Sequence, residues 1–169
     1  MPKQKTVQYL GRKLGEILVS LGKVAPDELE SVLIAQRNTS LRLGEYLLQR
    51  GAITEDDLLS ALSFQLGLEY HPDLLKDSGA VLSSNIPHGF IRRNNIVILK
   101  ETDDTVEIAT NDASRTEAVE NIKSVTGKDV VLVLARKLDI LRIADLLAGE
   151  ESESADKVIE GLELSLIHI

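Results

Sequence analysis

Apolar positions near the start of the chain recur at the spacing of one helix face. Four residues follow the i, i+3, i+4, i+7 pattern: Leu14, Ile17, Leu18 and Leu21. Gly22 comes next, and glycine readily adopts the left-handed conformation that ends a helix. The pattern therefore predicts a short helix that stops at Gly22.

A second amphipathic stretch follows this stop. Pro26 suits the first position of a helix, and the carboxylates of Asp27 and Glu28 favour its positive N-terminal end. One face of the stretch carries four residues at helical spacing: Leu29, Val32, Leu33 and Gln36. The two stretches together predict a helical hairpin.

The hairpin is duplicated. When the chain is shifted by 29 residues, segment 13–36 falls on segment 42–65, and residues 37–41 separate the copies. The coinciding pairs are Leu14 with Leu43, Gly15 with Gly44, Leu18 with Leu47, Gly22 with Gly51, Leu29 with Leu58, Leu33 with Leu62, and Gln36 with Gln65. In the second copy Thr54 is the expected N-cap, with Asp57 three residues later, close to a capping box. Two such hairpins are expected to pack as one small bundle.

The chain after residue 85 changes its pattern from helical repeats to alternating helices and β-branched runs. The expected order is helix 86–93, strand 96–99, strand 106–109, helix 114–125, strand 130–134 and helix 138–147. A polar turn over residues 101–104 joins the first two strands, and Gly127 stops the second helix. This order predicts a small α/β unit.

We therefore expect an α+β protein of two subdomains. Residues 1–80 form the helical repeat bundle of four to five helices, and residues 81–148 form the α/β unit with about three strands. Residues 149–169 begin with an acidic, apolar-poor run and are expected to be a solvated linker and tail. At 169 residues, with 43% hydrophobic and 27% charged residues, the chain has the length and composition of a globular protein.

Composition excludes several classes of function. Cysteine is absent, so disulfides, thiol catalysis and cysteine zinc sites are excluded, and the three histidines have no ligand spacing. A formal net charge of −8 and 3% aromatic residues argue against nucleic-acid binding. No apolar run approaches the roughly 20 residues of a membrane span, so we expect no direct membrane insertion and a cytoplasmic location. No phosphate loop or nucleophile–base set occurs, which makes an enzyme the least favoured class.

The charge is distributed unevenly along the chain. Residues 1–50 carry 8 Lys and Arg against 5 Asp and Glu, whereas residues 101–169 carry 7 against 16. An anion is therefore expected to bind in the first third of the chain, if it binds anywhere.

The duplicated pattern resembles the MshEN domain at the N-terminus of the hexameric ATPases that drive type II secretion and type IV pilus assembly. The resemblance rests on the doubled Leu-Gly start, the glycine that ends each first helix, and the Leu, Leu, Gln face of each second helix. Segment 65–70, followed by Asp73 and Leu74, is similar to the family's exit from the repeats. The α/β unit resembles the subdomain that follows in those ATPases, with markers at residues 86–87, 109–112 and 126–127. The closing residues 167–169 are similar to the residues that open the motor domain in this family, but Leu166 stands where the family has an aspartate. A truncation or a cloning remnant therefore explains these closing residues at least as well as a native motor start does.

The resemblance implies cyclic di-GMP as a regulatory ligand, with no cofactor and no metal. The residues assigned to it are Arg12, Lys13, Leu14, Gly15, Leu29, Leu33 and Gln36 in the first copy, and Arg42, Leu43, Gly44, Leu58, Leu62 and Gln65 in the second. A two-fold symmetric ligand suits a duplicated protein. Each Leu-Gly pair is expected at a helix start, where free N–H groups favour a phosphate and glycine allows close approach. Leucines can support the purines, and the glutamines can hydrogen-bond to the nucleotide.

One position departs from the family pattern. The family places arginine before each Leu-Gly pair, and Arg42 follows this rule, able to stack on a guanine or reach a phosphate. The first copy instead has Lys13, with Arg12 one residue earlier. Lysine keeps the charge but lacks the flat guanidinium, so either Arg12 takes over this role or the first half of the site is weakened.

Other interpretations of the same residues remain open. The leucines are by default core residues, Gly15 and Gly44 can serve helix packing, and the glutamines can cap or face solvent. The first subdomain is then a docking module that anchors an ATPase to the cytoplasmic domain of an inner-membrane platform protein, without nucleotide. In either case the resemblance implies a motor domain in the full-length chain and a location peripheral to the inner membrane through a partner.

Overall fold

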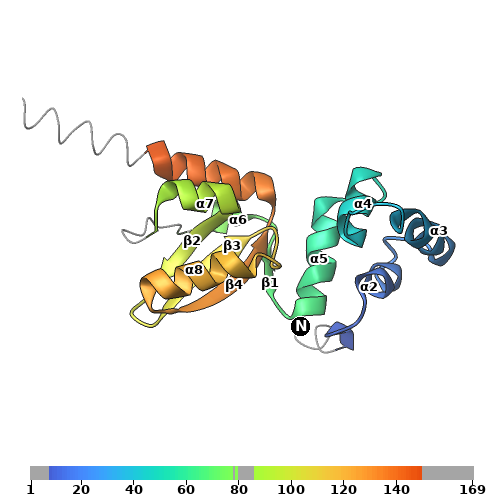
Figure 1. Ribbon diagram of the computed structural model, residues 1–169, viewed down its shortest axis with the longest axis horizontal. Coiled ribbons are helices and arrows are strands. Elements are labelled where there is room, and N and C mark those ends of the chain that lie inside the picture. The colour runs from blue at the N-terminus through green and yellow to red at the C-terminus, as the bar shows by residue number, and fades with distance from the viewer. Residues whose placement is uncertain (1–7, 78, 80–85, 150–169) are drawn as a thin grey trace, which may run out of the picture. The chain divides into compact units, whose positions relative to one another are not determined.

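A computed structural model describes residues 8–77, 79 and 86–149 (Figure 1). The chain divides into two units. The first comprises the residues up to Pro72 together with Leu132–Arg136, and the second comprises Asp73–Val131 and the chain from Lys137 onward. The linker and tail predicted for residues 149–169 lie outside the described residues, except for Gly149.

The predicted helical hairpins are confirmed. The first unit contains the helices α2 (Leu14–Ser20), α3 (Pro26–Gln36), α4 (Leu43–Gln49) and α5 (Glu55–Leu66). The hairpin α2–α3 comes from the first copy of the repeat and α4–α5 from the second.

The helices begin and end where the sequence pattern predicts, at N-terminal caps and at glycines. Gly22 and Gly51 have φ angles of +70° and +67°, the left-handed conformation that a Cβ disfavours. Pro26 is the first residue of α3, and Thr54 caps α5 by accepting the Asp57 N–H at 3.1 Å. Asp57 returns the bond by accepting the Thr54 N–H at 3.0 Å, which completes a capping box.

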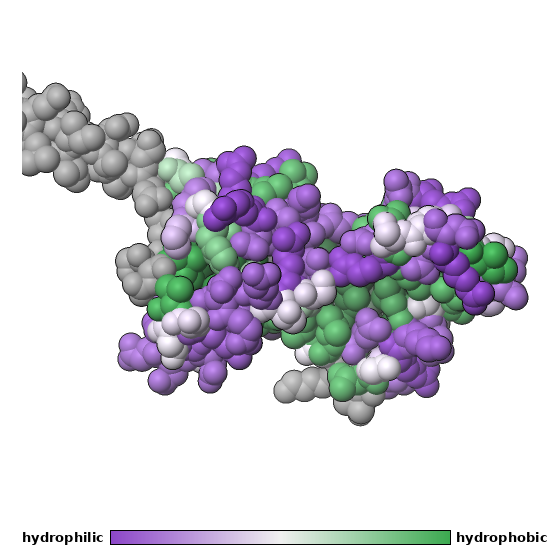
Figure 2. Space-filling view, viewed as in Figure 1, coloured by the Kyte–Doolittle hydropathy of each residue, from purple (hydrophilic) through white to green (hydrophobic). Residues whose placement is uncertain are grey.

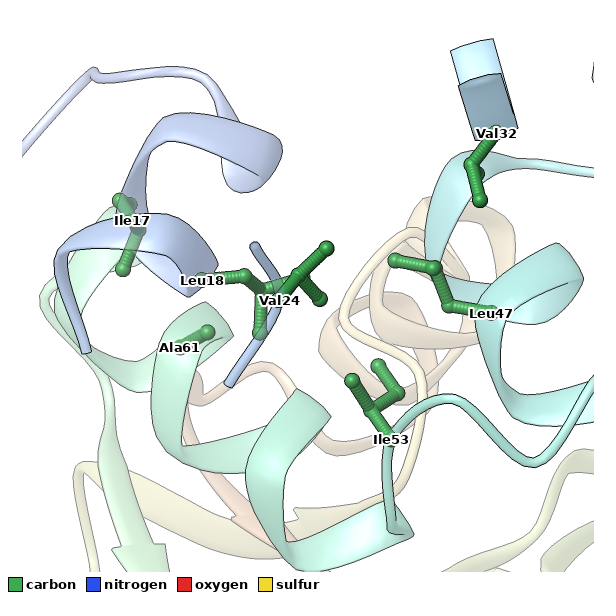
Figure 3. Packing of buried hydrophobic residues seen from close by; sticks show 7 residues of the cluster. All are labelled: Ile17, Leu18, Val24, Val32, Leu47, Ile53 and Ala61. Carbon is green, nitrogen blue, oxygen red and sulfur yellow. The ribbon is translucent and has the colours of Figure 1, made fainter. Parts of the chain in front are cut away.

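The core of the bundle combines apolar residues from both hairpins. Its buried members are Ile17, Leu18, Val24, Val32, Leu47, Ile53 and Ala61 (Figure 3). The expectation that Leu33 belongs to this core is wrong, because its side chain is 39% exposed. Helix α3 buries Val32 instead and carries Leu33 to the edge of the packed face.

The α/β unit has the predicted order of elements. They are α7 (His88–Asn94), β2 (Ile96–Glu101), β3 (Thr105–Thr110), α8 (Thr116–Thr126), β4 (Asp129–Ala135) and a helix over residues 137–149. A short additional helix, α6 (Leu74–Asp77), comes before α7 in the chain. Strands β2 and β3 pair antiparallel with Ile96 opposite Thr110, and their register shifts between Ile98 and Lys100. Helix α8 begins two residues later than predicted and ends at Gly127, whose φ is +68°.

A short strand that the sequence pattern did not predict is β1 (Glu69–His71). It pairs in parallel with the end of β4, with Glu69 opposite Val133 and His71 opposite Ala135, so the described sheet has the strand order β1-β4-β3-β2. Three residues are too few to show the alternation by which a strand is recognised, and the partner strand lies far along the chain. Long-range pairing therefore creates this strand.

In the part of the chain that the structure describes, no helix combines the length and the apolar character needed to cross a membrane.

Candidate functional site

The two Leu-Gly pairs occupy equivalent places at the starts of α2 and α4. Leu14 and Leu43 are the first helical residues, and Gly15 and Gly44 are the second and are buried. The N-cap residues are Lys13 and Arg42, both with extended backbone. The prediction that a cation and a Leu-Gly pair begin each first helix is therefore confirmed.

The two pairs face each other across the repeat. A Cβ placed on Gly15 would lie 3.4 Å from Leu43 Cδ2, and a Cβ placed on Gly44 would lie 3.4 Å from Leu14 Cδ2. Each glycine thus contacts the leucine that precedes the other glycine. This exchange brings the two helix starts together around a local two-fold relationship.

The second helix of each hairpin closes over its own glycine. The Cβ of a residue at Gly15 would lie 2.9 Å from Leu29 Cδ1, and at Gly44 it would lie 2.7 Å from Leu58 Cδ1. Both distances are too short for an ordinary contact, so a residue with a Cβ at either position would require the leucine side chain to move. Leu29 and Leu58 are half-buried and pack against the core.

The remaining predicted leucines are not equivalent. Leu62 on α5 is half-buried, whereas its counterpart Leu33 on α3 is exposed. The structure therefore places Leu29 and Leu58 against the two glycines, whereas Leu33 and Leu62 differ from each other in exposure.

Gln36 and Gln65 hold the loops before the two N-caps. Gln36 Nε2 donates to the Leu41 carbonyl at 2.8 Å, and Gln65 Nε2 donates to the Arg12 carbonyl at the same distance. Leu41 precedes Arg42, and Arg12 precedes Lys13, so both bonds follow the 29-residue register. Each glutamine uses its amide donor on the loop that leads into the other copy.

Arg12 does not occupy the place of Arg42 in the first copy. Its guanidinium carbon lies 5.9 Å from the centroid of the Tyr9 ring, at the range of a cation–π contact. Lys13 is the N-cap of α2, as Arg42 is of α4. The cation at the N-cap of the first helix is therefore a lysine, and the one at the equivalent position of the second copy is an arginine.

Glu45 contacts Arg42, a relationship that the repeat pattern alone does not single out. Its Oε1 lies 2.8 Å from an Nη atom of the Arg42 guanidinium, and its Oε2 accepts the Arg42 N–H at 2.9 Å. Both side chains are partly exposed, 56% for Arg42 and 43% for Glu45. The signal in the sequence is a glutamate three residues after each cation, since Glu16 is the counterpart in the first copy.

A second ion pair links the two hairpins away from the Leu-Gly pairs. Lys23 Nζ lies 2.8 Å from Asp57 Oδ1 and joins the turn after α2 to the start of α5. The hydrogen bond from Lys23, followed by the Thr54 N–H, lowers the pKa of the Asp57 carboxyl below its ordinary value.

Tyr70, Asp56 and Arg136 connect α5 to the β1–β4 pair within the first unit. The Tyr70 hydroxyl donates to Asp56, and Arg136 lies 3.8 Å from the same carboxylate. Arg136 also donates to the Pro72 carbonyl at 2.6 Å. Burial, followed by the hydrogen bond to Asp56, raises the pKa of Tyr70 well above its ordinary value.

The described residues hold no group of three or more metal-binding side chains. What they offer to a ligand is a duplicated arrangement of one cation, one buried glycine and apolar leucine side chains. Such an arrangement can bind an anion and a flat apolar group, and it suits a ligand with two similar halves.

Comparison with known families identifies the class of protein. The MshEN domain family matches residues 66–154, which is more than half of the chain, so the chain belongs to the MshEN family. The matched range begins at the end of α5 and covers the α/β elements, whereas the duplicated helical hairpins precede it. No curated protein sequence matches the chain.

Solved structures extend the likeness into the repeats. A structure of MshE with cdg, cyclic di-GMP, is 28% identical, has a TM-score of 0.69, and covers 80% of this chain and 99% of its own. The covered 80% of this chain is more than residues 66–169 alone make up, so the match includes part of the helical bundle. The N-terminal domain of XpsE shares the fold in two crystal forms, with TM-scores of 0.61 and 0.52 at 15% and 17% identity. These forms cover 78% and 77% of this chain and 91% and 90% of their own.

Proposed function

We propose that this chain is the regulatory N-terminal domain of a type II secretion or type IV pilus assembly ATPase, and that its repeats bind cyclic di-GMP. The observation that carries the proposal is the reciprocal contact of the two Leu-Gly pairs, Gly15 with Leu43 and Gly44 with Leu14. A ligand with two guanines and two phosphates can contact both copies of this arrangement at once.

The similarity to MshE supports this choice of ligand. MshE is solved with cyclic di-GMP, and the likeness reaches into the repeats. In the proposed complex Lys13 and Arg42 face the negative charge or stack on the guanines, and the half-buried Leu29 and Leu58 support the purines. Gln36 and Gln65 keep the loops before the two cations in place.

Calorimetric titration of the chain with cyclic di-GMP tests the proposal, with GTP and cyclic GMP as controls. We expect saturable binding of cyclic di-GMP near one ligand per chain, and a loss of at least about ten-fold in affinity in Arg42→Ala. Arg50→Ala is the matched control, because Arg50 is also on the second hairpin but stacks on Tyr46, 5.6 Å from its ring centroid. Absence of binding at high micromolar ligand, or equal losses in both variants, contradicts the proposal.

A second candidate function is docking to a protein partner. Leu33 and Ile34 are adjacent on α3 and are 39% and 60% exposed, and Figure 2 shows apolar surface at the edge of the helical unit where Figure 1 places α3. We propose the cytoplasmic domain of an inner-membrane platform protein as this partner, which places the chain in the cytoplasm, peripheral to that membrane. A pull-down with that domain tests it, and Ile34→Asp is expected to abolish the interaction without affecting nucleotide binding.

The proposed role is one of binding, and the catalytic step belongs to the motor domain of the full-length protein. Ligand binding would act on that motor through the chain that follows the repeats. Hydrogen exchange of residues 72–79 and 86–95, with and without cyclic di-GMP, tests this route, and unchanged exchange there would exclude it.

A further inference from the structure

Glu45 lies directly on the cation that the proposed function assigns to the ligand. Its carboxylate contacts the Arg42 guanidinium at 2.8 Å. We infer that Glu45 is an internal competitor for Arg42 and sets the affinity of the second half-site for an anionic nucleotide. This inference rests on the proposed function, because it requires the ligand to use Arg42.

The competition follows from the chemistry of the guanidinium. Arginine offers only N–H donors, and carboxylate and phosphate oxygens accept from them with the same geometry. A phosphate that approaches Arg42 must therefore displace the Glu45 oxygen or share the donors with it. The pair is weak because both side chains are partly exposed, so displacement is feasible. Once displaced, the carboxylate still repels the negative ligand from nearby.

Glu45 has a second role that does not depend on its charge. Its other oxygen accepts the Arg42 N–H at 2.9 Å and satisfies a free donor at the start of α4. A glutamine amide oxygen can make the same bond at this position of a helix. The substitution Glu45→Gln therefore removes the competing charge and keeps the cap.

The chain offers a matched control on α8. Glu120 is also paired with a cation three residues away, Lys123, with 3.8 Å between Glu120 Oε1 and Lys123 Nζ, and it lies in the second unit. Glu120→Gln makes the same change in net charge far along the chain from the repeats. Any effect of net charge alone appears equally in both variants.

The experiment is calorimetric titration of wild type, Glu45→Gln, Glu120→Gln and Arg42→Ala with cyclic di-GMP at low and high salt. We expect Glu45→Gln to bind about three- to ten-fold tighter than wild type at low salt, because one repulsive unit charge close to the ligand is removed. The gain should shrink at high salt through screening, and Glu120→Gln should match wild type.

The outcomes separate this inference from the function on which it rests. Wild-type binding that is lost in Arg42→Ala but unchanged or weakened in Glu45→Gln overturns the inference and leaves the proposed function standing. If no folded variant binds, Glu45→Gln included, both are overturned. Glu45→Ala, which also removes the cap, should bind tighter than wild type at low salt while its thermal midpoint falls, and a weaker affinity there would contradict competition.

Discussion

The side chain of Gln65 donates to the backbone carbonyl of Arg12, 53 residues earlier in the chain, at 2.8 Å. In the first copy, the equivalent bond runs from the Gln36 side chain to the carbonyl of Leu41, only five residues away. One bond is local and the other is long-range, yet they are equivalent in the repeat. The end of the second copy therefore holds the start of the first, and the duplicated segment is closed on itself.

This closure predicts different effects for the two glutamines. Gln65→Ala removes the donor to Arg12 and should speed hydrogen exchange in residues 11–17, which are then joined to residue 65 by the longer backbone bond from the Gly11 N–H to the residue 65 carbonyl, at 3.2 Å. Gln36→Ala should have a smaller effect, since Thr39 Oγ1 also contacts the same turn by donating to the Gln36 carbonyl at 2.9 Å. We expect a loss of about 1 kcal/mol in unfolding free energy for Gln65→Ala. Denaturant unfolding and exchange mass spectrometry measure both effects, with the exposed Gln49→Ala as control.

Close packing at Gly44 predicts that even one methyl group is harmful there. Gly44→Ala brings a Cβ within 2.7 Å of Leu58 Cδ1, so Leu58 must move. The cost of overpacking, about 1–3 kcal/mol, exceeds the helix-propensity gain of about 1 kcal/mol, so the free energy of unfolding should fall and ligand affinity with it.

Gly89 provides the control for this substitution. It is also the second residue of a seven-residue helix, α7, but a Cβ there meets nothing within 4 Å. Gly89→Ala is expected to raise stability slightly, because alanine is favoured in helices. Equal effects of the two substitutions in thermal unfolding would show that Leu58 adapts without cost.

If the proposed function holds, Lys13 in the first copy predicts that cyclic di-GMP binding by this half of the proposed site can be tightened. Lys13→Arg restores a flat guanidinium at the place equivalent to Arg42, and it should tighten cyclic di-GMP binding by about three- to ten-fold. Arg42→Lys should weaken binding by a similar factor. If Lys13→Arg has no effect while Arg42→Lys is harmful, the ligand uses the two halves differently.

The Lys23–Asp57 pair predicts an acid-dependent loss of stability. The pKa of Asp57 is lower in the folded chain than in the unfolded chain. The pair therefore stabilises the fold at pH values above the unfolded pKa, near 4, and this contribution disappears as the pH falls through the lower folded value. We expect it to be worth about 1 kcal/mol or less, because Lys23 is 45% exposed.

Chemical denaturation between about pH 3 and 7 measures this contribution. The pH dependence of Asp57→Asn should be flatter than that of wild type. Lys23→Met, which removes the partner, should flatten it as well, and the double variant should resemble the single ones. A wild-type slope that survives in both variants would assign the acid sensitivity to other carboxyls.

Much of the bundle and of its site followed from local patterns. The 3.6-residue spacing predicted the four helices, and Gly22, Gly51 and the Thr54 cap marked their ends, because these effects act within a few residues. The duplication itself placed the two Leu-Gly pairs in equivalent positions. These features need no knowledge of what packs against them.

Other features depend on residues that are distant in sequence. The strand β1 exists because residues 69–71 pair with β4, and the exposure of Leu33 depends on how α3 packs against the bundle. The sequence pattern predicts Gln36 and Gln65 as ligand donors, but it gives no sign that their amides also bond to the Leu41 and Arg12 carbonyls. A side chain's partner cannot be read from its own segment when several acceptors are within reach of the same donor.

The sequence by itself thus determined the repeated helices, their ends and the cations before each Leu-Gly pair, since helix periodicity and capping are local properties. Only the tertiary structure decided that each glycine faces the other copy's leucine and that Gln65 closes the repeat. These relationships arise from packing and side-chain geometry, in which the lowest free energy is set by contacts between segments and not by the segments alone.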